Sequence, residues 1–284
     1  MIYDFGKIKY DFSARSYIMG ILNITPDSFS DGGKFFDTSV KLNEVLRVAK
    51  EMERDGADFI DVGGESTRPG AEPVPLNEEL SRVVPVIEIL SKQLSIPISI
   101  DTYKSKVAEE ALKAGAVIVN DISGFNFDSK MPEVVSRYNA SCILMHIQGQ
   151  PKNMQVNPVY NNVITEIYEY LSNSINIARN YDINQIIIDV GFGFGKTLEH
   201  NIELLTHLNE FKKLGYPLLA GLSNKSFIDK IYPTPISERL SPTIAANIIA
   251  LINGVNIIRV HNVLENKKAL RIFDRVYKSY IYQV

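Results

Sequence analysis

Residues that could do chemistry recur at the carboxyl ends of short apolar segments along this chain. They include Asn23, Asp101, Asn120, His146, Asp189, Lys225, Arg259 and His261. Carboxylates and amides could bind the N–H groups of a flat polar ring, and clustered cations could bind an anion such as phosphate. These residues are distant in the sequence, so they could act together only if the apolar segments align with their carboxyl ends at one edge.

The apolar segments have the pattern of strands that are covered on both faces. They are near-continuous hydrophobic runs rather than alternating ones, as in a parallel sheet. We predict strands at 17–24, 58–63, 96–101, 116–121, 141–146, 185–190, 217–222 and 256–261. Amphipathic segments between them predict helices at 38–55, 77–94, 104–114, 159–180, 199–214, 241–253 and 263–280.

Repetition of strand and helix predicts an α/β fold, a single (β/α)8 TIM barrel whose active site lies at the C-terminal ends of the strands. A doubly wound open sheet is the competing architecture, but its nucleotide-binding fingerprint is absent. The 284 residues show no break in composition, which predicts one domain over 1–284. Residues 1–15 are expected to form a short N-terminal β-hairpin, with its strands in 2–12, that caps the bottom of the barrel.

Three predicted strand-end loops, 25–37, 64–76 and 148–158, are unusually long. Their Gly, Pro, Ser and Asp residues disfavour helix and strand. Long loops at the catalytic face usually act as lids or binding loops.

Composition narrows the functional class. The formal net charge of −3 gives no electrostatic basis for binding nucleic acid or an anionic membrane surface. The single cysteine, Cys142, excludes a disulfide framework and is expected in the core. No apolar run approaches the ~18–20 residues of a membrane span, and the N-terminus lacks a signal-peptide core. A cytoplasmic protein is therefore expected.

The segment DVGFGFGKT (189–197) superficially resembles a nucleotide-binding loop. A P-loop requires a glycine where this chain has Val190, and the glycine spacing does not match GxGxxG. The glycines are better explained as letting the backbone turn closely past a flat ligand, with Phe192 or Phe194 offering a ring.

Four aspartates near predicted strand ends could bind the adjacent N–H donors of an aminopyrimidine or a pterin. They are Asp61, Asp101, Asp121 and Asp189, and Asn120 adds a donor and an acceptor. Each aspartate alone is equally compatible with a helix cap or a structural salt bridge.

A cation cluster is expected on the last two strands, a region of this fold that often binds phosphate. Its members are Lys225, Arg259 and His261. Asn23 is a weak metal ligand by itself and fits only a Mg²⁺ ion that is held mainly by substrate phosphates.

Eight segments together resemble the dihydropteroate synthase family of pterin-binding barrels, and they cover nearly the whole chain in the family order. They are MGILNITPDSFSDGG (19–33), GGESTRPGA (63–71), SIDTYKSKVA (99–108), VNDISG (119–124), MHIQGQPKNMQ (145–155), DVGFGFGKT (189–197), GLSNKSFI (221–228) and IIRVHNV (257–263).

This resemblance implies a transferase of folate biosynthesis. The implied reaction condenses (7,8-dihydropterin-6-yl)methyl diphosphate with 4-aminobenzoate and gives 7,8-dihydropteroate and diphosphate, through dissociative substitution at the pterin methylene. It also implies Mg²⁺ as cofactor, a homodimer, and inhibition by sulfonamides.

Site residues follow from the same resemblance. The pterin would contact Asp101, Asn120, Met145, Asp189 and Lys225, and the diphosphate would contact Thr67, Arg259 and His261. The 4-aminobenzoate would contact Phe29, Thr67, Arg68, Pro69 and Ser226, and Asn23 would hold Mg²⁺. The catalytic residues would be Lys225, Arg259, His261 and Asp31.

Two departures from the family pattern lie beside the expected anion site. The usual Ser-Arg-Lys contains Asn224 in the middle, which removes one cation, and the usual Arg-Val-His-Asp ends in Asn262. Two alternatives therefore remain: a methyltetrahydrofolate-dependent methyltransferase, which would not need the cations or the STRPG loop, and a non-catalytic pterin-binding paralogue, which the loss at Asn224 would favour.

Overall fold

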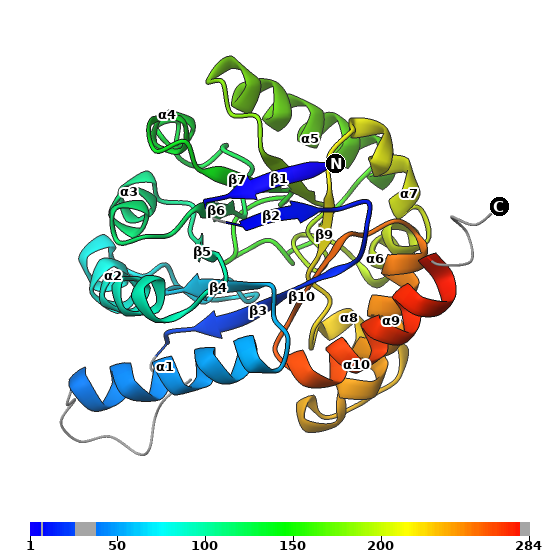
Figure 1. The fold of residues 1–284 in the computed structure, drawn as a ribbon. Coiled ribbons are helices and arrows are strands. Elements are labelled where there is room, and N and C mark those ends of the chain that lie inside the picture. Colours follow the sequence, from blue (N-terminus) through cyan, green and yellow to red (C-terminus); the bar gives the residue numbers. More distant parts are fainter. Residues whose placement is uncertain (7, 26–37, 279–284) are drawn as a thin grey trace.

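A closed barrel of parallel strands forms the centre of the molecule (Figure 1). The computed structural model describes residues 1–6, 8–25 and 38–278. Around the barrel the strand order is β10-β3-β4-β5-β6-β7-β8-β9. The bounds are β3 Tyr17–Asn23, β4 Phe59–Gly63, β5 Ile98–Asp101, β6 Ile118–Asp121, β7 Ser141–Met145, β8 Ile186–Asp189, β9 Leu218–Ala220 and β10 Ile257–Val260. Closure between β10 and β3 confirms the barrel and excludes the open sheet.

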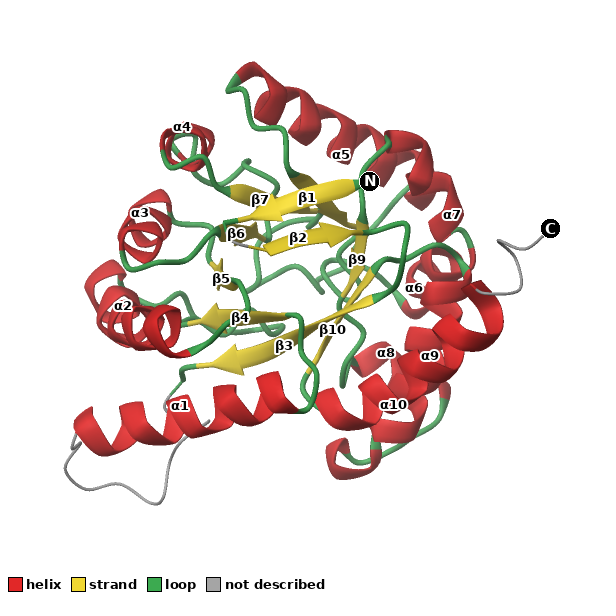
Figure 2. Cartoon of the chain, viewed as in Figure 1, coloured by secondary structure: helices red, strands yellow, loops and turns green. Residues whose placement is uncertain are grey.

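Helices surround the barrel, as the secondary-structure colouring shows (Figure 2). The expected ones are α1 Thr38–Arg54, α2 Leu76–Gln93, α3 Ser105–Lys113, α5 Val163–Asn180, α6 Leu198–Thr206, α9 Leu240–Ile252 and α10 Val263–Phe273. Further short ones are α4 Met131–Arg137, α7 Leu208–Phe211 and α8 Ser226–Ile231. Among the described residues, none of these helices is long and apolar enough to cross a membrane.

Several predicted helix boundaries were wrong, for local reasons. The helix expected from residue 159 begins at Val163, because the Asn162 side chain accepts a hydrogen bond of 2.8 Å from Thr165 N and caps it. The single helix expected over 199–214 breaks at His207, whose backbone leaves the helical region. Helices α4 and α8 were missed because 7 and 6 residues are too few to show a helical period.

Alternation along each strand divides the barrel into an interior and an exterior. Exterior residues such as Ile60, Val62 and Ile100 pack against the helices. Interior residues at the N-terminal ends of the strands are large and apolar, and they form one layer: Met19, Phe59, Ile118, Ile143, Ile187, Leu219 and Ile257. Two residues further along the strands, the interior residues become polar, as with Asp61 after Phe59 and Arg259 after Ile257. The same alternation that fills the lower barrel therefore places the functional groups.

An N-terminal hairpin covers the lower end of this layer, as expected. Strands β1 Ile2–Phe5 and β2 Ile8–Asp11 pair antiparallel and lie across the barrel (Figure 1). Their aromatic side chains pack into the apolar layer, and the Tyr10 ring stacks on Phe59 with centroids 4.7 Å apart. The buried hydroxyls are satisfied, since Tyr3 donates to Ile186 O and Tyr10 to Asp58 O, both at 2.8 Å.

Candidate functional site

A polar layer lies in the barrel above the apolar one, and Arg259 joins three of its strands. Its Nε donates to Asp61 Oδ2 at 2.6 Å, and its Nη2 donates to Asp101 Oδ2 at 2.7 Å. Asn120 Nδ2 donates to the same Asp61 oxygen at 2.9 Å. Both carboxylates keep the pKa of Arg259 raised although burial opposes this. The guanidinium is therefore a fixed cation in the centre of the barrel.

Asp61 is more central than the sequence suggested. It was one of four strand-end aspartates but had no assigned role, and the structure buries it completely beneath Arg259 and Asn120. The sequence contained a signal for this position. Side chains alternate along a strand, so Asp61 points to the same interior face as Phe59. Asp121 has a structural role, but it is neither the helix cap nor the salt bridge considered for it. Its carboxylate accepts hydrogen bonds from Ser123 and Phe125 and holds the turn after β6.

Two buried carboxylate oxygens have no partner among the described residues. They are Asp61 Oδ1 and Asp101 Oδ1. A buried acceptor without a donor is costly, and such atoms in native structures usually meet a ligand or water. Burial raises the pKa of Asp101 to about 7, although Arg259 opposes the shift. The centre of the barrel thus offers unused acceptor capacity to a ligand with N–H groups.

Asp189 at the end of β8 and Lys225 beyond β9 complete the polar layer. Asp189 Oδ1 accepts a hydrogen bond of 2.8 Å from Gly191 N, and burial raises its pKa. Lys225 immediately precedes α8, and its Nζ lies 4.1 Å from the centre of the Phe194 ring. Burial lowers the pKa of Lys225 to about 8, against the pull of Asp189. The acidic and basic groups of the site are therefore poised to exchange hydrogen bonds with a bound ring.

An apolar wall flanks the polar layer. Met145 at the end of β7 packs with Ile122, Ile147, Met154 and Phe194 in one buried cluster. Such a surface suits the face of an aromatic ring, and the polarizable Met145 sulfur adapts to its shape. Met145 was expected to contact a pterin, and the structure places it beside Asp189, its pairing partner on β8.

His261 lies one residue beyond β10 at the cation side of the site. Its Nδ1 is 2.9 Å from Ser223 Oγ. Burial, together with the charges of Arg259, Arg68 and Lys225, lowers its pKa to about 4. Four basic side chains therefore converge here, which is an arrangement suited to a multiply charged anion.

The residues expected to bind 4-aminobenzoate lie nearer the rim. Arg68 and Pro69 are exposed on the loop after β4, and Ser226 is exposed at the first turn of α8. Within the described residues, Thr67, Pro69 and Ser226 form no hydrogen bond to the polar layer. The structure brings Arg68 within electrostatic range of His261 but does not assemble the other rim residues into one contact. Phe29 and Asp31 lie outside the described residues.

Asn23, the residue expected to hold Mg²⁺, lies close to Gly63 and Asp101. It ends β3, and a β-carbon added at Gly63 would lie 3.4 Å from Asn23 Oδ1 and 3.7 Å from Asp101 Cβ. In the described part of the chain no group of three or more His, Cys, Asp or Glu could hold a metal. One amide oxygen fits Mg²⁺ only if a substrate supplies the other ligands.

The two family departures differ in their surroundings. Asn224 has φ 59, a left-handed conformation that Asn tolerates better than most residues. Its carbonyl accepts a hydrogen bond of 3.3 Å from Arg239 Nη1. Asn262 is exposed at the N-terminus of α10, and its side chain forms no capping hydrogen bond.

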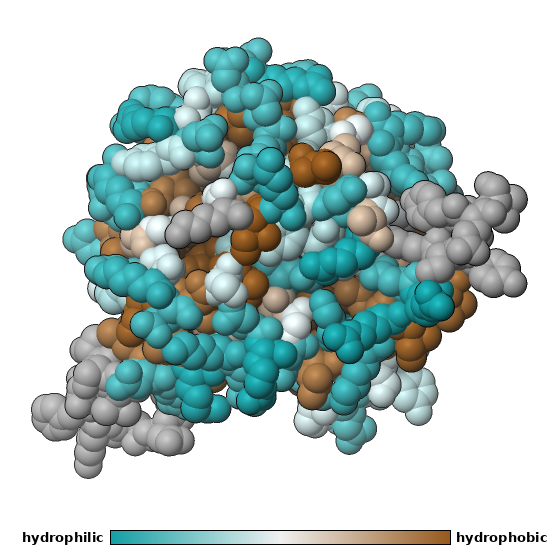
Figure 3. Space-filling model, viewed as in Figure 1, coloured by the Kyte–Doolittle hydropathy of each residue, from teal (hydrophilic) through white to brown (hydrophobic). Residues whose placement is uncertain are grey.

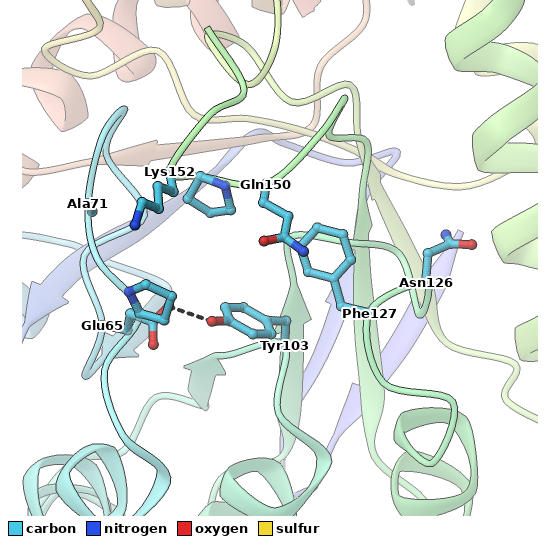
Figure 4. A pocket seen from close by; sticks show the side chains of 9 residues that line it. Glu65, Ala71, Tyr103, Asn126, Phe127, Gln150 and Lys152 are labelled. Atoms are coloured by element: carbon cyan, nitrogen blue, oxygen red, sulfur yellow. Dashed lines mark hydrogen bonds between the residues drawn. The ribbon is translucent and has the colours of Figure 1, made fainter. Parts of the chain in front are cut away.

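A separate pocket of about 370 Å³ lies at the rim, between the loops that follow β4, β5, β6 and β7 (Figure 4). Tyr103 and Phe127 form its walls, and the Tyr103 hydroxyl donates to Glu65 Oε1 at 2.7 Å. Lys104 also binds Glu65, at 2.5 Å. The pocket does not include the polar layer. It marks the place where the loop after β4 meets the loop after β7, which Gly70 N and Pro151 O join at 3.1 Å.

Fold and site together define a (β/α)8-barrel enzyme that binds a flat, hydrogen-bonding ring beside an anion site. A family model described as pterin binding enzyme matches residues 19–261. The dihydropteroate synthase of Clostridium beijerinckii is 47% identical over 272 residues, 95% of this chain and 97% of that protein.

Solved structures of similar proteins agree with the sequence relatives. Dihydropteroate synthase from Clostridium difficile, crystallised in the presence of pteroic acid, has a TM-score of 0.88 and 47% identity, covering 94% of this chain and 99% of that one. The Yersinia pestis enzyme with a sulfonamide drug has a TM-score of 0.90 and 41% identity, covering 98% and 100%. The chain belongs to the dihydropteroate synthase family of pterin-binding enzymes.

Proposed function

We propose that this chain condenses (7,8-dihydropterin-6-yl)methyl diphosphate with 4-aminobenzoate to give 7,8-dihydropteroate and diphosphate. The observation that carries the proposal is the unsatisfied Asp101 Oδ1 beside Asn120, together with Asp189 at the end of β8 and Lys225 beyond β9 in the same polar layer. The 2-amino and ring N–H groups of a dihydropterin would donate to the carboxylates, and Lys225 would donate to a ring acceptor. Met145 and Phe194 would pack against the ring faces.

The diphosphate would lie against Arg259 and His261, with Thr67 at the loop edge. When the C–O bond of the methylene breaks, the electron pair leaves with the diphosphate, and fixed cations stabilise the charge that builds there. Asn23 would help to hold Mg²⁺, which would supply Lewis-acid stabilisation of the leaving group. His261 with a pKa of about 4 is neutral at pH 7, so it would act as a hydrogen-bond donor through Nε2 rather than as a cation.

The amine nitrogen of 4-aminobenzoate then forms the new C–N bond and releases one proton. It needs no strong base, because it is uncharged at neutral pH. Arg68, Pro69 and Ser226 at the rim would hold the aminobenzoate, and Phe29 and Asp31 would act from the preceding loop. Sulfonamides would occupy the same position, since a relative binds such a drug.

We also propose a homodimer through the last helices. Exposed apolar side chains recur there, with Ile249 and Ile252 on α9 and Leu264 and Ile272 on α10. The hydropathy surface shows brown areas where Figure 1 draws these helices (Figure 3). The cytoplasm is the proposed location.

The test is diphosphate release from the dihydropterin diphosphate with Mg²⁺, with and without 4-aminobenzoate. Stimulated release with stoichiometric dihydropteroate supports the synthase. Tight pterin binding without release would instead identify the binding paralogue. Methyl transfer from methyltetrahydrofolate, without diphosphate release, would identify the methyltransferase.

Arg259→Ala is the matching variant, expected to abolish turnover. More than about a tenth of the wild-type rate, a loss below ~1.4 kcal/mol, would refute its role. Arg15→Ala is the control, because Arg15 pairs with Asp58 at 2.7 Å at the opposite end of the barrel.

A further inference from the structure

Lys196 is a buried lysine that the proposed mechanism does not use, and burial lowers its pKa well below the ordinary value. Only 2% of its surface is exposed, and its Nζ meets three acceptors: Gly191 O at 2.8 Å, Phe194 O at 2.9 Å and His146 Nδ1 at 2.9 Å. In the described residues no carboxylate forms an ion pair with it. Two amine protons satisfy the two carbonyls, and the direction of the hydrogen bond with His146 Nδ1 depends on the His146 tautomer.

These contacts hold a turn that has no regular secondary structure to satisfy it. In the segment 191–195, Gly193 O accepts from Gln155 Nε2 at 2.5 Å, and Gly195 O accepts from the Tyr160 hydroxyl at 2.8 Å. Gly193 N also donates to Asn201 Oδ1 at 2.8 Å. Lys196 donates to Phe194 O and to Gly191 O, and the Gly191 carbonyl also accepts from Phe194 N at 3.1 Å. Lys196 is the donor that binds the turn from inside the protein and joins it to β7 through His146.

The turn carries contacts to the predicted pterin residues. Gly191 N donates to Asp189, and the Phe194 ring lies under Lys225 Nζ. The turn also packs tightly on the end of β7, since a β-carbon added at Gly191 would lie 1.9 Å from His146 O. Small movement of this segment would therefore change the surroundings of both charged groups.

We propose that Lys196 is a positioning residue for the pterin subsite, which sets the place of the 191–195 turn and, through Phe194 and Gly191, the orientation of Lys225 and Asp189. The role in pterin binding rests on the proposed function, but the effect of Lys196 on the 191–195 turn can be tested without any substrate.

The first experiment is NMR of the ligand-free protein. The Phe194 ring face should shift the Lys225 Hε protons upfield in the wild type. Methionine has a side-chain volume similar to that of lysine but makes none of the three polar contacts of Lys196 Nζ. Lys196→Met should therefore abolish this shift. Asn247→Ala is the control, because Asn247 forms a hydrogen bond of similar burial to Asn266 at 2.9 Å between α9 and α10. It should lower stability and leave the shift in place. A shift that persists in Lys196→Met overturns the proposal.

The second experiment measures substrate dependence. Lys196→Met should raise the KM for the dihydropterin substrate at least about tenfold, equivalent to ~1.4 kcal/mol, and leave the KM for 4-aminobenzoate nearly unchanged. If Lys196 acts through Phe194, the effect of Lys196→Met in a Phe194→Ala background should be much smaller than in the wild type. Equal changes in both KM values, or additive effects of Lys196→Met and Phe194→Ala, would overturn the proposal.

Lys196→Gln, which keeps an amide donor, replaces the Met variant if that variant does not fold. It should give the same pattern of KM changes with smaller magnitudes. A wild type that lacks turnover would refute the proposed function and leave the NMR result to decide the positioning role.

Discussion

Arg259 Nε and Asp61 Oδ2 form a hydrogen bond of 2.6 Å between β10 and β4, strands that are not neighbours in the barrel because β3 lies between them. Asp61 is completely buried, whereas 19% of the Arg259 side chain is exposed. The carboxylate thus holds the guanidinium from below and leaves its upper side for an anion.

Asp61→Asn should therefore impair catalysis through Arg259. The amide keeps the volume but loses the charge, and breaking a buried pair typically costs about 3–5 kcal/mol of stability. We expect a lower melting temperature and a fall in kcat of at least about tenfold. Asp58→Asn, which breaks the pair with Arg15 at the other end, should lower stability alone. Wild-type kcat in Asp61→Asn would contradict this role.

The pKa of Lys225, lowered to about 8 by burial, predicts an alkaline limit to activity. Lys225 is protonated below this pKa, so kcat/KM for the dihydropterin substrate should fall as pH rises through about 8. Lys225→Arg should remove that limb, because arginine keeps its proton throughout the accessible range, even if the overall rate is lower. Lys152→Arg, at the exposed rim, should leave the profile unchanged. An unaltered alkaline limb in Lys225→Arg would assign it to another group.

The left-handed backbone at Asn224 predicts opposite effects from two substitutions. Asn224→Gly should be neutral or stabilising because glycine adopts φ 59 without strain. Asn224→Arg, which restores the usual family residue, should cost up to about 1 kcal/mol of stability. Thermal unfolding of both variants checks this. Similar melting temperatures for the two would show that the backbone conformation does not select Asn here.

Phe59 should be one of the most costly core positions. It is fully buried and contacts three hairpin or strand aromatics, namely Phe5, Tyr10 and Tyr17. Phe59→Ala should lower the free energy of unfolding by about 3–5 kcal/mol. Ile202→Ala, at an exposed position on α6 and outside the proposed dimer surface, is the control. A loss below about 1 kcal/mol for Phe59→Ala would mean that the hairpin collapses into the space.

The sequence was sufficient for the barrel because each strand carries its own hydrophobic run. The eight predicted strands match β3 to β10 within two residues at each end, whereas the short helices α4 and α8 left no periodic signal. Placement of Asp101, Asn120, Asp189, Lys225, Arg259 and His261 at one end of the barrel followed from strand ends alone.

The spacing of residues in the sequence could not predict which distant side chains pair with one another. The Asp61–Arg259 and Lys196–His146 contacts depend on how side chains cross the barrel interior and on a turn without regular structure. Lys196 was considered only as part of a failed nucleotide motif. Its role becomes visible only when its three acceptors are seen together.

The N-terminal hairpin has a consequence for the order in which the chain folds. Its aromatic residues are synthesised before the strands of the barrel, yet their binding surface includes Ile257, and Asn256 Nδ2 donates to Phe12 O at 3.0 Å. Contacts of such large sequence separation form slowly, because most of the chain must be ordered before they are available. On the ribosome the hairpin must therefore remain exposed until β10 has emerged, and its docking reports that the barrel has closed.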